Sequence, residues 1–135
     1  YRKAFPRTPI IKTGSTTAET VKYFINCFLS TKVSFANEMK QVCDSIDVDF
    51  DKVVEYALYD DRIGKSHLSV PGPDGSLGFG GHCFPKDLNA IIHMASLNSI
   101  ETPVLSGVWK KNLEVREPEN RDWETMIGRA VIKSD

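Results

Sequence analysis

Residues 16–47 read TTAETVKYFINCFLSTKVSFANEMKQVCDSID, and this stretch decides the fold. It contains no proline or glycine, and its apolar residues recur mostly three or four positions apart, which is the spacing of one helix face. Thr16 and Glu19 fit a capping box at its start. The pattern predicts one helix to about Asp47, roughly 45 Å long at about 1.5 Å per residue. We expect a helix of this length to pack against a second domain or a second chain.

The rest of the chain predicts shorter helices, so the expected fold class is mainly α. Asp49 or Asp51 can cap a helix over residues 52–58. Apolar spacing predicts further helices over residues 88–98, over 104–113, and from 122 onward. Only residues 10–13 predict a strand, and one short strand needs a sheet to join.

The composition is that of one ordinary globular domain. Of the 135 residues, 41% are hydrophobic and 26% are charged, which allows a core and argues against a disordered chain. With 17 basic and 18 acidic residues the net charge is −1, which leaves no overall electrostatic footprint for nucleic acid or an anionic membrane. The apolar runs are far shorter than a bilayer span, and the N-terminal stretch YRKAFPRTP lacks the apolar core of a signal peptide. We expect a cytoplasmic protein with no nucleic-acid or membrane partner.

The three cysteines are Cys27, Cys43 and Cys83. They have neither metal-ligand nor CxxC spacing, and they cannot all pair internally. We therefore expect no metal site and a reducing compartment.

Residues 76–87 read SLGFGGHCFPKD and form the predicted site. Three glycines precede Cys83, and Pro85 then opens a segment with helical periodicity. Glycine lets a ligand approach the main chain closely, and proline is well placed in the first turn of a helix. A cysteine just before that turn faces unpaired N–H groups and the positive end of the helix dipole, which favours a thiolate. The stretch predicts an activated nucleophile beside a glycine-lined pocket. The turn-rich loop before it, residues 65–77, either shapes that pocket or is a plain surface excursion.

Other polar residues could assist this cysteine, although most have a plainer interpretation. Lys22 and Asn26 lie four residues apart and offer donors for an oxyanion. From spacing alone, a solvated lysine and an incidental asparagine are favoured. Asp87, one turn beyond Cys83, could hold a water molecule or a lysine ammonium. Arg62 lies in an acidic turn, where a local ion pair is favoured over a free fork for a carboxylate or phosphate.

Three sequence blocks resemble the UDP-glucose/GDP-mannose dehydrogenase family. The block GFGGHCFPKDLNAII resembles its catalytic-cysteine motif, AETVKYFINCFLSTKVSFANEM resembles the long helix of its central domain, and DDRIG resembles its arginine-bearing turn. The blocks occur in the family's order and span most of residues 18–97. The loop VPGPDGSLGFGG is most similar to that of the UDP-glucose 6-dehydrogenases.

The resemblance implies a role for each candidate residue. Cys83 matches the family's nucleophile. Lys22 and Asn26 match the pair that contacts the reacting oxygen and the attacking water, and Asp87 matches the aspartate that helps to position that water. Arg62 matches the arginine that reaches across a dimer interface to the neighbouring subunit's substrate. The residues that match the loop wrapping the nucleotide sugar are Asp74, Gly75, Ser76, Leu77, Gly78, Phe79 and Gly80, and those that border the nicotinamide are Cys83, Phe84, Pro85 and Lys86.

The resemblance also implies a reaction and partners. Family members oxidise the C6 alcohol of a nucleotide sugar to a carboxylate with two NAD, through a thiohemiacetal and a thioester on the cysteine. For this chain it implies a UDP-sugar substrate, UDP-glucose being favoured, NAD as cofactor, and a homodimer formed through the long helix. Residues 1–15 would be the tail of an N-terminal NAD-binding domain and residues 16–135 the central domain, so we expect the chain alone to be inactive.

Other functions remain open at this point. The chain could be a non-catalytic helical dimerisation module, or it could belong to a GDP-mannose or UDP-N-acetylhexosamine dehydrogenase. A cysteine hydrolase is a weaker alternative, because His82 is adjacent to Cys83 in sequence and the geometry of such a pair is poor.

Overall fold

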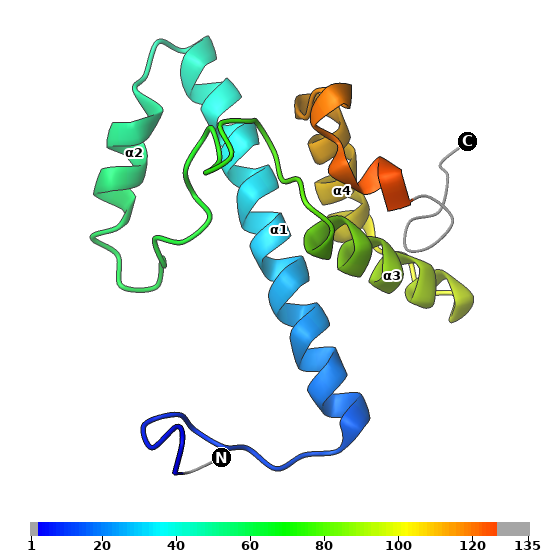
Figure 1. The fold of residues 1–135 in the computed structure, drawn as a ribbon. Coiled ribbons are helices and arrows are strands. Elements are labelled where there is room, and N and C mark those ends of the chain that lie inside the picture. The colour runs from blue at the N-terminus through cyan, green and yellow to red at the C-terminus, as the bar shows by residue number, and fades with distance from the viewer. Residues whose placement is uncertain (1–2, 127–135) are drawn as a thin grey trace.

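The computed structural model describes residues 3–126, and over this range the chain is mainly helical, as predicted (Figure 1). The elements are α1 (Ser15–Ser45), α2 (Phe50–Ala57), α3 (Cys83–Leu97) and α4 (Pro103–Val115), followed by the 3-10 helices η1 (Pro118–Asn120) and η2 (Asp122–Met126). The long helix α1 is the central element, with α3 and α4 packed on one side and α2 on the other (Figure 1). None of the helices described is long and apolar enough to cross a bilayer.

The long helix is confirmed, but its predicted cap is wrong. The helix begins at Ser15, Gly14 occupies the N-cap position, and no side chain caps it. A cap residue has non-helical backbone angles, whereas Thr16 already lies inside the first turn. The carbonyl of Thr16 accepts a hydrogen bond from the Thr20 hydroxyl at 2.8 Å.

The structure also tests the predicted strand, the predicted cap of the second helix and the last predicted helix. The strand predicted at residues 10–13 is wrong, since no strand is assigned anywhere in residues 3–126 and a strand needs a neighbour to pair its backbone. Asp49 is the cap of α2, because its carboxylate accepts hydrogen bonds from the backbone N–H groups of Asp51 and Lys52 at 3.0 and 3.4 Å. The helix predicted from residue 122 begins as η2, and its continuation lies outside the described residues.

The core consists of two clusters along α1. The first lies under α3 and α4 and is formed by Cys27, Phe79, Leu88 and Val108. The second lies toward α2 and is formed by Ala36, Cys43, Phe50 and Val70. Because Phe79 belongs to the glycine-rich stretch before α3, the first cluster also anchors that stretch to the helices.

The apolar periodicity of α1 marks a face that the described chain leaves uncovered. Phe24, Phe28 and Phe35 on this helix are 71%, 57% and 59% exposed, and the first two rings stack with centroids 6.5 Å apart. The side of α1 toward α4 instead buries small polar residues. One of them, Ser34, donates a hydrogen bond to the Val108 carbonyl at 2.9 Å. Besides the surfaces that contact α2, α3 and α4, the helix therefore has an apolar face that residues 3–126 leave exposed.

Candidate active site

Asp87 is the centre of a polar cluster between α1 and α3. Its side chain has no exposed surface, and it accepts hydrogen bonds from Asn26 Nδ2 at 2.5 Å and Lys86 Nζ at 2.6 Å, with Lys22 Nζ 3.3 Å away. Burial opposes ionisation of this carboxyl, but the hydrogen bonds from Lys86, Asn26 and Lys22 outweigh it and lower the pKa of Asp87. The carboxylate is therefore charged and gathers two ammonium groups and an amide at one point.

The helices place these groups by simple geometry. Lys22 and Asn26 lie one turn apart on α1, so both reach the same side chain of α3. Spacing alone favoured a solvated lysine and an incidental asparagine, but their contacts with a buried carboxylate make both part of one cluster. The lysine remains 56% exposed, which leaves part of its donor capacity free for a ligand.

Cys83 is the first residue of α3, and its side chain is exposed. Asp87 follows four residues later, so the sulfur and the carboxylate cluster lie about one turn apart along the same helix. The first-turn N–H groups of α3 and the helix dipole favour negative charge at this position. The thiol thus lies at the mouth of a helix, beside the polar cluster and not sealed in the core.

Cys27 offers an internal comparison for the reactivity of Cys83. It is buried, and burial, followed by the nearby charge of Asp87, raises the pKa of its thiol to about 11. At about pH 8, roughly one Cys27 thiol in a thousand would be a thiolate. We expect iodoacetamide to modify Cys83 first and Cys27 last in the folded chain, as followed by mass spectrometry of the peptides. Equal rates for the two cysteines would contradict the arrangement.

A cavity of about 500 Å³ lies next to the start of α3 and is lined by parts of the loop 66–74, by residues 78–80, and by Val33 and Phe84. Of the seven residues predicted to wrap a nucleotide sugar, Asp74, Gly78, Phe79 and Gly80 line it, whereas Gly75, Ser76 and Leu77 do not. His67 also lines it, and its ring lies 5.6 Å from that of Phe84. The loop therefore lines a cavity, but Cys83, Lys22 and Asp87 do not line it, so its role in shaping a binding site beside the cysteine stays a prediction.

The four residues predicted to border a nicotinamide differ in exposure. Cys83 is exposed, Phe84 and Lys86 are partly buried, and Pro85 is fully buried in the first turn of α3. Only the first three offer surface to a cofactor. Within residues 3–126 no three histidine, cysteine or acidic side chains lie close enough to hold a metal ion.

Arg62 forms the local ion pair that its acidic turn predicted. Its Nη2 lies 2.5 Å from Asp60 Oδ2, its side chain is 89% exposed, and it does not line the cavity. A contact with a substrate across a subunit interface would require it to turn away from Asp60.

Three buried polar residues that sequence reasoning assigned no role hold the glycine-rich stretch in place. They are Asn37 on α1, Asn112 on α4 and Arg116 at the end of α4. The groups that they bind in this stretch are backbone N–H and C=O groups, so their spacing in the sequence carries no signal that could have identified them.

Comparison with known proteins decides the family. Residues 16–114 match the family described as UDP-glucose/GDP-mannose dehydrogenase family, central domain. The chain belongs to this family. The resemblance to this family seen in the sequence is thereby confirmed.

Relatives from both branches of the dehydrogenase family are similar to this chain. UDP-glucose 6-dehydrogenase TuaD of Bacillus subtilis (strain 168) is 36% identical over 108 residues, which cover 80% of this chain and 22% of the relative. GDP-mannose 6-dehydrogenase of Azotobacter vinelandii is 37% identical over 105 residues, covering 77% and 23%. A solved UDP-glucose dehydrogenase from the archaeon Pyrobaculum islandicum superposes with a TM-score of 0.71 at 33% identity, covering 84% of this chain and 26% of that one. The chain thus spans about a quarter of the length of these proteins or less.

Proposed function

We propose that this chain is the central domain of a UDP-glucose 6-dehydrogenase, in which residues 1–15 are the tail of a preceding NAD-binding domain. The observation that carries the proposal is the cluster of Lys22, Asn26 and Lys86 around the buried carboxylate of Asp87, one helical turn from an exposed cysteine. Such a site suits a substrate that is held covalently while it is oxidised twice, from a C6 alcohol to a carboxylate.

Cys83 supplies the covalent steps. Its sulfur adds to the carbonyl carbon of the C6 aldehyde, and the carbonyl oxygen takes a proton to complete a thiohemiacetal. Oxidation of this adduct gives a thioester, and addition of water to its carbonyl releases the carboxylic acid and returns the sulfur as a thiolate. NAD, when bound, would accept one hydride in each of the two oxidations.

The polar cluster serves the oxygen atoms in these steps. Lys22 uses one of its N–H donors on Asp87 and can direct another to the developing oxyanion, where a fixed donor lowers the barrier. A carboxylate has about four acceptor positions. Three donors already occupy Asp87 and its side chain has no exposed surface, so the attacking water would be bound by the exposed ammonium group of Lys22, which Asp87 holds in place. Cys83, Phe84 and Lys86 present the surface that would face the nicotinamide.

A protection experiment tests the substrate class without requiring turnover, since we propose that the isolated chain is inactive. The rate of Cys83 alkylation is measured with UDP-glucose, with GDP-mannose and with neither. We expect UDP-glucose to slow the reaction severalfold, because the bound sugar would cover the sulfur, and GDP-mannose to have little effect. Protection by GDP-mannose alone would assign the chain to the other branch of the family. Protection by neither would contradict the proposed site.

We also propose that the chain forms a homodimer through the uncovered face of α1. Phe24, Ile25, Phe28 and Phe35 form an exposed apolar stripe on this helix, beside an apolar hollow of about 490 Å³ between α1, α3 and α4. An exposed apolar face of this kind is typical of a subunit interface.

The dimer makes a direct prediction. We expect light scattering to show twice the mass of one chain, and Phe28→Glu to give a monomer, because it places a charge in the stripe. Ser15→Glu adds the same charge to an exposed position on the opposite side of α1, nine residues before Phe24, and should remain dimeric. A monomeric unsubstituted chain would contradict the proposal.

A further inference from the structure

Residues 77–81 cross the helices as irregular backbone, yet four of their backbone polar groups are bound by buried side chains. Asn112 is fully buried, and Asn37 and Arg116 are each 3% exposed. None of these three lines the cavity, whereas Gly78, Phe79 and Gly80 do. The three side chains therefore contact the stretch without lining the pocket that it helps to form.

The two asparagines bind the stretch as a neighbouring strand would. Asn112 Oδ1 accepts a hydrogen bond from the Phe79 N–H at 2.7 Å, and its Nδ2 donates to the Phe79 carbonyl at 3.0 Å. Asn37 Oδ1 accepts from the Gly78 N–H at 3.2 Å. Asn112 on α4 thus binds both the N–H and the C=O of Phe79, and Asn37 on α1 binds the N–H of Gly78.

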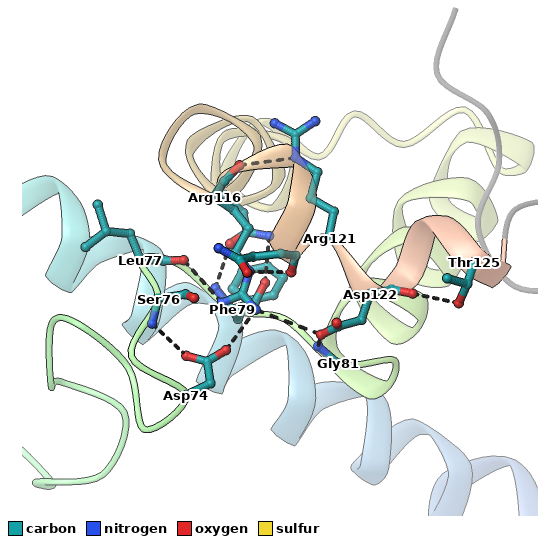
Figure 2. A network of polar contacts seen from close by, with 11 residues as sticks. Asp74, Ser76, Leu77, Phe79, Gly81, Arg116, Arg121, Asp122 and Thr125 are labelled. Carbon is teal, nitrogen blue, oxygen red and sulfur yellow. Dashed lines mark hydrogen bonds and ion pairs between the residues drawn. The ribbon is translucent and has the colours of Figure 1, made fainter.

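Arg116 contacts one end of the same stretch directly and is connected to the other end through Asp122, as Figure 2 shows. Its Nη1 donates to the Leu77 carbonyl at 3.3 Å, and its Nη2 lies 2.8 Å from Asp74 Oδ2. Asp122, whose Oδ2 lies 3.9 Å from Nη2, accepts the Gly81 N–H at 2.8 Å (Figure 2). A Cβ on Gly80 would overlap the guanidinium, so the backbone lies directly against it.

Burying an arginine and two amides is costly unless every donor and acceptor is matched. Apolar side chains could fill the same space, but they could not define the direction of each backbone N–H and C=O in a segment without secondary structure. Hydrogen bonds from rigid helices give that definition. The buried polar side chains therefore indicate that the backbone of residues 77–81, which lines the cavity, must keep one fixed shape.

We propose that Arg116 and Asn112, with Asn37, are positioning residues for the nucleotide-sugar site. They hold residues 77–81 in the shape that the sugar nucleotide requires and act on affinity through the backbone, without touching the ligand. This inference rests on the proposed function, because it takes the cavity as the site of the sugar nucleotide.

The test compares Arg116→Lys with Arg121→Lys in the 135-residue chain. Arg121 is the matched control, because it also binds backbone carbonyls, those of Leu113 and Arg116, but contacts no residue of the stretch. Amide hydrogen exchange reports the stretch, and ligand-observed NMR with UDP-glucose up to millimolar concentration reports its affinity. We expect Arg116→Lys to speed exchange of the Phe79 and Gly81 amides, and to weaken binding, each by about tenfold, with helix amides unchanged. Arg121→Lys should leave both unchanged.

The outcomes separate this inference from the proposed function. Faster exchange with unchanged affinity, or unchanged exchange, would overturn the positioning role. Failure of the unsubstituted chain to bind UDP-glucose would overturn the proposed function, and this inference with it. If Arg116→Lys does not fold, Asn37→Ala removes a single hydrogen bond to the stretch. It should then speed exchange of the Gly78 amide and weaken binding, and the absence of either effect would overturn the inference.

Discussion

Replacing Asp87 by asparagine is expected to lower the free energy of unfolding by about 3 kcal/mol at neutral pH. The side chain keeps its shape but loses the charge that holds the ammonium groups of Lys22 and Lys86. Its new amide hydrogens would also face the Asn26 amide, which is a donor at this point. Urea denaturation followed by circular dichroism measures the change. Asp44→Asn is the control, because its ion pair with Lys40 is exposed and should contribute less than about 1 kcal/mol.

The cluster around Asp87 also predicts how the free energy of unfolding depends on pH. Because the pKa of Asp87 is lowered on folding, its contribution is fully present above its unfolded pKa of about 4. The contribution disappears as the pH falls below that value and passes through the folded pKa. The difference between the unsubstituted chain and Asp87→Asn should therefore be constant near neutrality and shrink below about pH 4. A difference that grows in acid would show that the carboxyl is protonated in the folded chain.

Gly78→Ala is expected to destabilise the chain by a similar amount, about 3 kcal/mol. Gly78 has a φ of 66°, which a residue with a Cβ adopts only with strain, and the added Cβ would overlap Asn112 Oδ1. Asn112 cannot move aside without losing its hydrogen bonds to Phe79. The loop, the buried amide or both must shift, so exchange of the Phe79 amide should also accelerate.

In contrast to Gly78→Ala, the substitution Gly107→Ala is expected to stabilise the chain. Gly107 is exposed within α4, and a Cβ there would meet no atom within 4 Å. Alanine in a helix interior should then stabilise the protein by about 0.5–1 kcal/mol. Loss of stability in Gly107→Ala would contradict the open space around Gly107, and an unchanged stability in Gly78→Ala would contradict the contacts assigned to Gly78.

Local sequence pattern predicted the candidate site only where its residues are neighbours in sequence, whereas Lys22 and Asn26 were assigned to the site by the family resemblance. Cys83, Pro85 and Asp87 share one short helical segment, so their placement follows from the turn of a helix. The meeting of Lys22 with Asp87 does not, because they are 65 positions apart and local spacing cannot report a contact between two helices. Arg116 was missed for a similar reason, since its partners include backbone carbonyls of a distant loop.

The sequence by itself determined the long helix α1, the start of α3 at the cysteine motif, and the dehydrogenase family. Helical periodicity, a proline in the first turn and a glycine-rich approach act between near neighbours. Only the tertiary structure decided that the phenylalanines of α1 remain uncovered, that no strand forms at residues 10–13, and that a buried carboxylate joins α1 to α3. These three features depend on which residues, far apart in the sequence, come into contact in the folded chain. Burial and hydrogen bonding are set by those contacts and not by neighbouring residues.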